Sequence, residues 1–130
     1  MSADVFKDNV AIITGASSGI GRAVALQLAD QGAWLSLAAR DADRLEATTN
    51  ECCQRGGRAI GVKTDVGVEA DCKNLIEHTA AEYGRIDTLI NNAGISMWTR
   101  FAELKDLSVL DRIMRVNYLG VAIIQRRKTS

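Results

Sequence analysis

Short apolar runs alternate along this chain with longer stretches in which apolar and polar residues mix. Four of these runs, residues 10–14, 34–39, 58–64 and 86–90, have the length and composition of strands buried in a sheet. The longer stretches repeat apolar residues at helical spacing, and several of them end at glycines. Strands that alternate with helices predict an α/β fold, a doubly wound parallel sheet with helices on both faces.

The first two predicted helices have recognisable ends. The first follows the glycines after the first strand and ends at Gly32. Its apolar face comprises Ile20, Ala23, Val24, Gln27 and Leu28. The second helix starts at Asp43, with Glu46 in the position of a capping box, and reaches Gln54.

Two further helices are predicted in the second half of the chain. The third ends at Gly84, and its apolar face comprises Val68, Cys72, Leu75, Ile76, Thr79, Ala80 and Tyr83. A long fourth helix starts at Asp106 or Ser108. Its apolar face comprises Leu110, Ile113, Met114, Asn117, Val121 and Ile124. A short basic tail, residues 125–130, follows this helix.

The order of the four strands can be predicted from topology. Right-handed crossovers and the nucleotide-binding rule for open parallel sheets favour the order 3-2-1-4. A ligand crevice then lies over the carboxyl ends of the strands, near the switch point between the first and fourth strands. Each candidate cofactor-binding residue named below lies at or just after such an end.

Residues 14–21, T-G-A-S-S-G-I-G, join the first strand to the first helix. Gly15, Gly19 and Gly21 permit a tight turn, a close approach of the backbone to a phosphate, and close packing of the helix on the strand. The helix start presents free N–H groups and a positive dipole end to an anion. Ser17 and Ser18 add hydroxyl donors, although either can instead cap the helix. The alternative is a glycine-rich turn without a ligand.

This stretch resembles the signature of the short-chain dehydrogenase/reductase family. Asn91-Asn92-Ala93-Gly94, after the fourth strand, resembles a second motif of that family, and the resemblance extends to about Ile124. It implies a Rossmann-like fold and an oxidoreductase that transfers hydride between a nicotinamide dinucleotide and a small alcohol or ketone. It implies cofactor contacts from Gly15, Ser17, Ser18, Gly19, Ile20, Gly21, Asn92, Ala93 and Gly94. A purely structural role remains open for Asn91, whose amide can fasten the turn.

The end of the second strand bears on the choice between the two nicotinamide cofactors. An acidic residue there would bind the ribose hydroxyls, whereas a basic residue accommodates a 2′-phosphate. Arg40 follows this strand directly, and its planar guanidinium suits a phosphate. We therefore expect NADP(H), with NAD(H) as the alternative. Arg40 can instead pair with Asp41 or Asp43 on the surface.

Two further positions match residues to which the family assigns a role. Asp65-Val66, after the third strand, resembles the pair that lies against the adenine, although it can also form a simple turn before the next helix. Asn117 matches the family's catalytic asparagine, which orders a water in the proton relay. A buried amide on an apolar helix face requires hydrogen bonds in any case, so bonding to the backbone is the alternative for Asn117.

The family's proton donor is a tyrosine followed four residues later by a lysine, together with a serine that holds the substrate oxygen. Tyr83 is followed at that spacing by Asp87, and Tyr118 by Ala122, so neither fits. We expect the chain to be one dinucleotide-binding domain over residues 1–130, incomplete at its carboxyl end and inactive alone. The alternatives are a non-catalytic nucleotide-binding module and a non-functional truncation product. With later elements missing, the fourth strand would be a bare sheet edge.

The composition of the chain indicates which partners, metal sites and cellular location to expect. Sixteen basic and sixteen acidic residues give no net charge, so neither nucleic acid nor an anionic membrane is an expected partner. The three cysteines lack C-x-x-C spacing and the one histidine, His78, lies in a polar stretch, so no metal site is expected. The polar start of the chain lacks a signal peptide's apolar core, which favours a cytoplasmic location. A homo-oligomer remains open.

Overall fold

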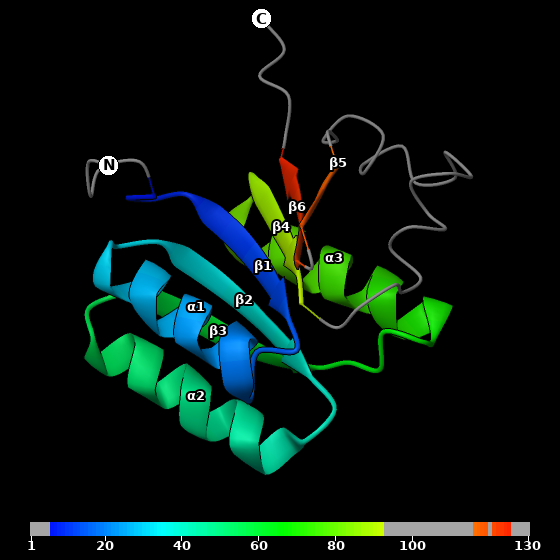
Figure 1. Cartoon of the computed structure of the whole chain (residues 1–130), viewed down its shortest axis with the longest axis horizontal. Helices are drawn as coiled ribbons and strands as arrows, with labels where there is room; N and C mark the ends of the chain where they lie inside the picture. Colours follow the sequence, from blue (N-terminus) through cyan, green and yellow to red (C-terminus); the bar gives the residue numbers. More distant parts are fainter. Residues whose placement is uncertain (1–5, 93–115, 120, 126–130) are drawn as a thin grey trace, which may run out of the picture.

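The computed structural model describes residues 6–92 and, as backbone, residues 116–119 and 121–125 (Figure 1). Three strand–helix units come first: β1 (Val10–Thr14) and α1 (Gly19–Asp30), β2 (Trp34–Ala39) and α2 (Ala42–Gln54), β3 (Arg58–Lys63) and α3 (Glu69–Tyr83). The strands β4 (Thr88–Asn91), β5 (Val116–Leu119) and β6 (Val121–Gln125) follow.

The sheet contains the predicted strand order. Its six described strands lie in the order β3-β2-β1-β4-β6-β5, and the first four are parallel. The predicted order 3-2-1-4 and the α/β fold class are therefore confirmed. Thr14 pairs in register with Ala38 on one side and with Asn91 on the other. This register brings the carboxyl ends of the three central strands to one edge of the sheet.

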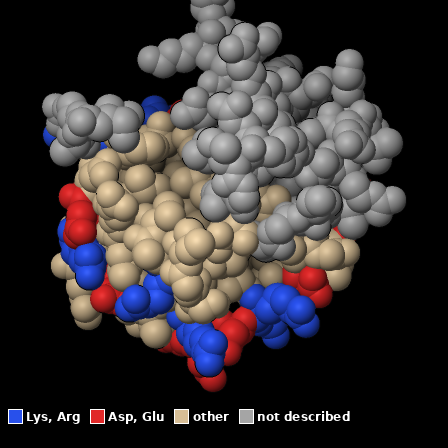
Figure 2. All heavy atoms as spheres, viewed as in Figure 1, with Lys and Arg blue, Asp and Glu red and all other residues tan. Residues whose placement is uncertain are grey.

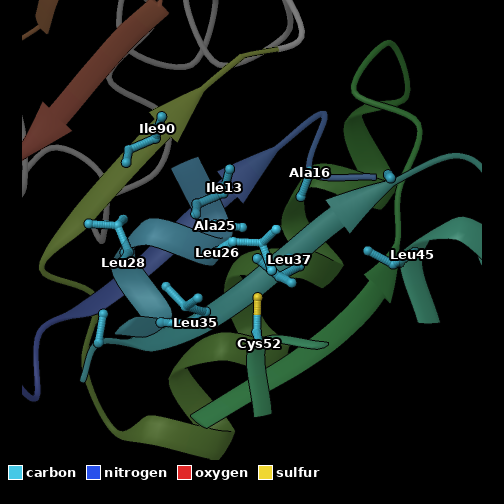
Figure 3. Packing of buried hydrophobic residues seen from close by; sticks show 14 residues of the cluster. Ile13, Ala16, Ala25, Leu26, Leu28, Leu35, Leu37, Leu45, Cys52 and Ile90 are labelled. Atoms are coloured by element: carbon cyan, nitrogen blue, oxygen red, sulfur yellow. The ribbon is translucent and has the colours of Figure 1, made fainter. Parts of the chain in front are cut away.

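Helices cover both faces of the parallel strands, and β1, β2 and β4 are buried by side chains that alternate between the two faces, whereas β3 is largely exposed. Ile13 and Leu37 point to the side of α1 and α2, within the cluster shown in Figure 3. Ile12 and Ala38 point the other way and pack with Leu75 of α3. Two apolar layers thus hold the sheet between α1 and α2 on one side and α3 on the other (Figure 1).

The helix ends agree with the sequence at three of four marked positions. Gly32 and Gly84 adopt the left-handed φ of +80° and +78° that terminates α1 and α3, and α2 ends at Gln54 as predicted. The predicted start of α2 at Asp43 is wrong. Asp41 caps this helix, because its carboxylate accepts from the backbone N–H groups of Asp43 and Arg44, each at 3.1 Å.

The predicted apolar face of α1 is partly wrong. Leu28 is buried, but Ala23 and Gln27 are exposed and Ile20 is 65% exposed. The buried residues of the helix are Gly21, Ala25, Leu26, Leu28 and Ala29. Small side chains form much of this face because the helix packs closely on the sheet. A prediction that follows the larger apolar side chains therefore selects the wrong face of the helix.

The long fourth helix is also wrong over its described part, because residues 116–119 and 121–125 form two strands. β6 pairs antiparallel with β4, and β5 pairs antiparallel with β6. The bare edge expected for β4 is therefore covered by β6. The sequence V-N-Y-L and V-A-I-I-Q is rich in β-branched and aromatic residues. The outer edge of β4 offers backbone partners that such a segment can use.

Candidate nucleotide-binding site

The glycine turn between β1 and α1 adopts a conformation that requires its glycines. Gly15 and Gly19 have φ values of +62° and +55°, a region that other residues rarely adopt. A Cβ added to Gly21 would lie 2.1 Å from the Gly15 carbonyl oxygen and 2.7 Å from the Asn92 side-chain nitrogen. A Cβ on Gly19 would meet nothing within 4 Å. Gly21 therefore packs the helix onto the turn, whereas Gly19 borders open space.

Backbone donors of the first turn of α1 lie next to Gly19 and this open space. Within the described part of the chain, the amide groups of Gly19, Ile20 and Gly21 have no acceptor, and the first backbone bond runs from Arg22 N to the Ser18 oxygen at 3.3 Å. Ser18 is the N-cap residue but makes no side-chain cap bond, and Ser17 is half-buried. These three N–H groups and the positive helix end can receive an anion.

A hydrogen-bonded cluster joins this turn to the end of β4. The buried Thr14 hydroxyl donates to the Asn91 side-chain oxygen at 2.8 Å and accepts from the Asn92 backbone N–H at 3.1 Å. The Asn92 side-chain nitrogen lies 3.5 Å from the Gly15 carbonyl oxygen. Asn91 therefore fastens the strand ends, which supports the structural alternative for this residue. The sequence did not single out the Thr14 hydroxyl as the centre of the cluster.

A groove of about 620 Å³ lies at the carboxyl ends of β2 and β3. It is lined by Arg40, Asp41, Lys63, Asp65 and Asp71. Arg40 is exposed, and its guanidinium has no ion-pair partner within residues 6–92, so the surface pairing with Asp41 or Asp43 is not observed. Asp41 instead lies beside Arg44, with an N–O distance of 3.6 Å.

The Asp65-Val66 pair forms a closed turn on the wall of this groove. One Asp65 carboxylate oxygen accepts from the Gly67 N–H at 2.9 Å, and Asp71 accepts from the Asp65 N–H at 2.9 Å. The Val66 side chain packs against the core cluster under α3, and the Cys72 thiol lies 3.6 Å from the Val66 carbonyl oxygen. The turn alternative is therefore observed, and it leaves Asp65 and Val66 beside the groove.

The side chains of three predicted residues, Ala93, Gly94 and Asn117, lie outside the described part of the chain. Ala93 and Gly94 lie outside the described residues, as does the start of the predicted fourth helix. Asn117 lies on β5, and its catalytic role stays a prediction. Lys63 and Asp71 were not singled out, because their neighbours in space come from other strands and turns.

Burial raises the pKa of three side chains, Cys52, Cys72 and Tyr83. Burial raises the pKa of Cys52 to about 11 and that of Cys72 to about 12. It also raises the pKa of Tyr83 to about 12, and the Tyr83 hydroxyl donates to the Leu35 carbonyl at 2.9 Å. Tyr83 is thus a structural residue of the α3 interface. Among the helices of the described segments, none is long and apolar enough to cross a membrane.

Charge is evenly mixed on the surface around the α1–α2 face. Figure 2 shows basic and acidic side chains next to one another along its rim. Arg22 pairs with Glu51, and Arg55 pairs with Asp30 and Glu51 at 3.0 and 3.6 Å. The pairs of Arg22 with Glu51 and of Arg55 with Asp30 link α1 to α2, so these two cations are neutralised locally.

Comparison with known proteins identifies the family. Residues 9–128 match the model of the short chain dehydrogenase family, and the chain belongs to this family. It is 40% identical to 11-beta-hydroxysteroid dehydrogenase-like 4A of Arabidopsis thaliana over 112 residues. The aligned region covers 85% of this chain and 38% of that protein. It is 41% identical over 111 residues to 1,6-dihydroxycyclohexa-2,4-diene-1-carboxylate dehydrogenase of Acinetobacter baylyi, covering 85% and 42%.

Solved structures of dehydrogenases are similar to this chain. A hydroxysteroid dehydrogenase from Escherichia coli matches with a TM-score of 0.66 and 30% identity over 68% of this chain and 38% of that chain. The apo form of a Caenorhabditis elegans glucose dehydrogenase matches with a TM-score of 0.66 and 38% identity over 77% and 44%. The chain thus spans about two fifths of the length of the relatives it matches.

Proposed function

We propose that this chain binds NADP(H) in preference to NAD(H), as the cofactor-binding part of an oxidoreductase that interconverts an alcohol and a ketone. Family membership supports the use of a nicotinamide dinucleotide, which supplies or accepts hydride when bound. The single observation that carries the proposal is the set of amides at Gly19, Ile20 and Gly21, which have no acceptor among the described residues, at a helix start where Gly19 borders open space.

The residues present fit such a cofactor. Gly19 borders space that a Cβ would enter without touching protein, as a turn that admits a phosphate requires. Ile20 is 65% exposed at the same place, so its side chain leaves the approach to the helix start open. Ser17, Ser18 and Asn92 would add polar contacts near the turn, and Ala93 and Gly94 stay predicted contacts.

The preference for NADP(H) rests on the end of β2. Arg40 occupies the position where a basic residue accommodates a 2′-phosphate, and its guanidinium is exposed and without an ion-pair partner in the described segments. The carboxylate of the neighbouring Asp41 caps α2 by accepting two backbone N–H groups, and it lies beside Arg44. Asp41 is therefore poorly placed to bind ribose hydroxyls, as an NAD(H)-selective carboxylate would.

The 130 residues contain no tyrosine followed four places later by lysine. We therefore expect this chain to bind the dinucleotide without turning over a ketone, with Asn117 as the one candidate for a catalytic role. A non-catalytic nucleotide-binding module is the second candidate, and the same missing motif favours it. A small alcohol or ketone as substrate follows from the family, a cytoplasmic location is a prediction from the sequence, and a homo-oligomer remains open.

Isothermal titration calorimetry with NADPH and NADH tests the proposal, alongside melting curves with each nucleotide. We expect measurable binding, tighter for NADPH, and a rise in melting temperature because ligand stabilises the folded state. Absence of binding by a folded chain would refute the proposed function. An Arg40→Ala variant that keeps the preference for NADPH would refute only the assignment of Arg40. Ketone-dependent NADPH oxidation by the pure chain would refute the claim that these 130 residues lack a proton donor.

A further inference from the structure

Lys63 and Arg40 come together at the end of the sheet although they are 23 positions apart in the sequence. Ala39 of β2 and Lys63 of β3 are register partners in parallel strands, and Arg40 is the next residue after Ala39. Both cationic side chains are exposed and line the same groove of about 620 Å³. Among the described residues, these two are the basic side chains that line this groove.

The acidic side chains of the groove already make hydrogen bonds within the chain, whereas the two basic side chains do not. Each of its three carboxylates already accepts backbone N–H groups: Asp41 from Asp43 and Arg44, Asp65 from Gly67, and Asp71 from Asp65. Neither Lys63 nor Arg40 has an ion pair or side-chain hydrogen bond among residues 6–92. The acids are fixed as turn and cap elements, whereas the two cations keep their donors available for an anion from outside the chain.

We propose that Lys63 is a second specificity-determining residue for the 2′-phosphate, acting together with Arg40. This inference rests on the proposed function, because it assigns a ligand group to the same nucleotide site. Arg40 supplies a planar donor pair, and Lys63 supplies a point charge on a flexible stem from the neighbouring strand. A phosphate dianion held between two cations gains more than one held by Arg40 alone, while a ribose hydroxyl gains little from either.

The test measures the affinity of Lys63→Met for four ligands: NADPH, NADH, adenosine 2′,5′-bisphosphate and adenosine 5′-phosphate. We expect roughly five- to tenfold weaker binding of the two ligands with a 2′-phosphate, and unchanged binding of the other two. Lys73→Met is the matched control, because Lys73 is an exposed lysine of α3 that does not line the groove. Lys63→Arg keeps the charge and should retain the preference. Far-ultraviolet circular dichroism establishes that each variant is folded.

The outcomes separate this inference from the proposed function. Equal loss of NADPH and NADH binding in Lys63→Met, or no loss of either, overturns the role of Lys63. If Arg40→Ala abolishes the preference while Lys63→Met keeps it, the inference fails and the proposed function stands. If the unmodified chain does not prefer NADPH, the cofactor assignment fails at its first step. A smaller dependence of NADPH affinity on salt in Lys63→Met would further support the inference, since one fewer cation contacts the phosphate.

Discussion

Gly21 at the start of α1 lies directly against the carbonyl of Gly15, so closely that an added Cβ would come within 2.1 Å of that oxygen. The helix can therefore pack directly against the turn before it only because Gly21 has no side chain. The contact holds the first turn of α1 against the glycine turn. Two glycines of one motif therefore have different roles: Gly21 packs the helix against the turn, and Gly19 lies beside open space.

Gly21→Ala should destabilise the protein and abolish nucleotide binding. The methyl group must push α1 away from the turn, which costs about 1–3 kcal/mol of the free energy of unfolding by overpacking. The same displacement moves the amides of Ile20 and Gly21 away from the phosphate position. Urea unfolding and calorimetric titration with NADPH measure the two effects. A variant with normal stability and affinity would contradict the close packing seen here.

Gly19→Ala provides the contrast. Its Cβ would enter open space, so the cost to stability is only that of a left-handed φ, roughly 1–2 kcal/mol. The methyl group would nevertheless lie where we place the phosphate. NADPH affinity should therefore fall more than stability predicts. If Gly19→Ala keeps its affinity once the folded fraction is corrected, the ligand does not approach this residue.

The Thr14 hydroxyl is predicted to matter for both folding and binding. Thr14→Val removes the donor to Asn91 and the acceptor for the Asn92 N–H while keeping the shape of the side chain. Losing these two hydrogen bonds costs about 1–3 kcal/mol of the free energy of unfolding. Asn92 loses its anchor beside the glycine turn, so NADPH affinity should also fall.

Thr88→Val is the matched control for this experiment. Thr88 is also buried, and its hydroxyl bonds the Asn9 side chain at 3.0 Å. It lies at the opposite end of β4, away from the nucleotide site. Thr88→Val should lower stability without a change in affinity for NADPH. Equal effects of both variants on affinity would show that Thr14 acts only through global stability.

The parallel part of the fold could be predicted because its information is local. The apolar run of β1 was placed at its observed bounds, and that of β2 likewise. β3 ends one residue earlier than expected, at Lys63, and β4 begins two residues later, at Thr88. Gly32 and Gly84 marked helix ends because a left-handed residue there is a local requirement. Strand order followed from the handedness of the crossovers.

The errors arose where the structure depends on distant partners. Residues 116–125 contain apolar residues at helical spacing, yet their described segments pair with each other and, through β6, with β4. The site follows the same rule: Arg40 was identified from its place after a strand, whereas Lys63 enters the groove only through its register with Ala39. Asp41 took the capping role from Asp43 because its backbone is extended, with φ −87° and ψ 105°.

Thiol reactivity should distinguish the three cysteines. Cys53 is exposed, whereas Cys52 and Cys72 are buried with pKa values raised to about 11 and 12. Only the thiolate reacts rapidly, so the buried thiols should be protected in the native state. Brief alkylation at pH 7.5 followed by peptide mass spectrometry should find label on Cys53 alone. Label on Cys72 at a comparable rate would contradict the burial of α3 on the sheet.

The raised pKa of Cys72 also predicts how stability depends on pH. Its pKa is 9.0 ordinarily and about 12 in the folded protein, because burial disfavours the thiolate. Below pH 9 both states keep the proton, and the contribution is constant. Between pH 9 and 12 only the unfolded state ionises, so the free energy of unfolding falls by up to about 1.4 kcal/mol per pH unit for this group.

Cys72→Ala isolates this contribution. The variant loses a packed thiol and should be less stable than the unmodified protein by a constant amount between pH 6 and 8. Because alanine has no proton to lose, its stability should then fall less steeply above pH 9, and the two curves of free energy against pH should converge. Curves that stay parallel from pH 6 to 11 would show that the thiol ionises equally in both states. In that case the contact between α3 and the Asp65-Val66 turn must be looser than the 3.6 Å approach of Cys72 to Val66 indicates.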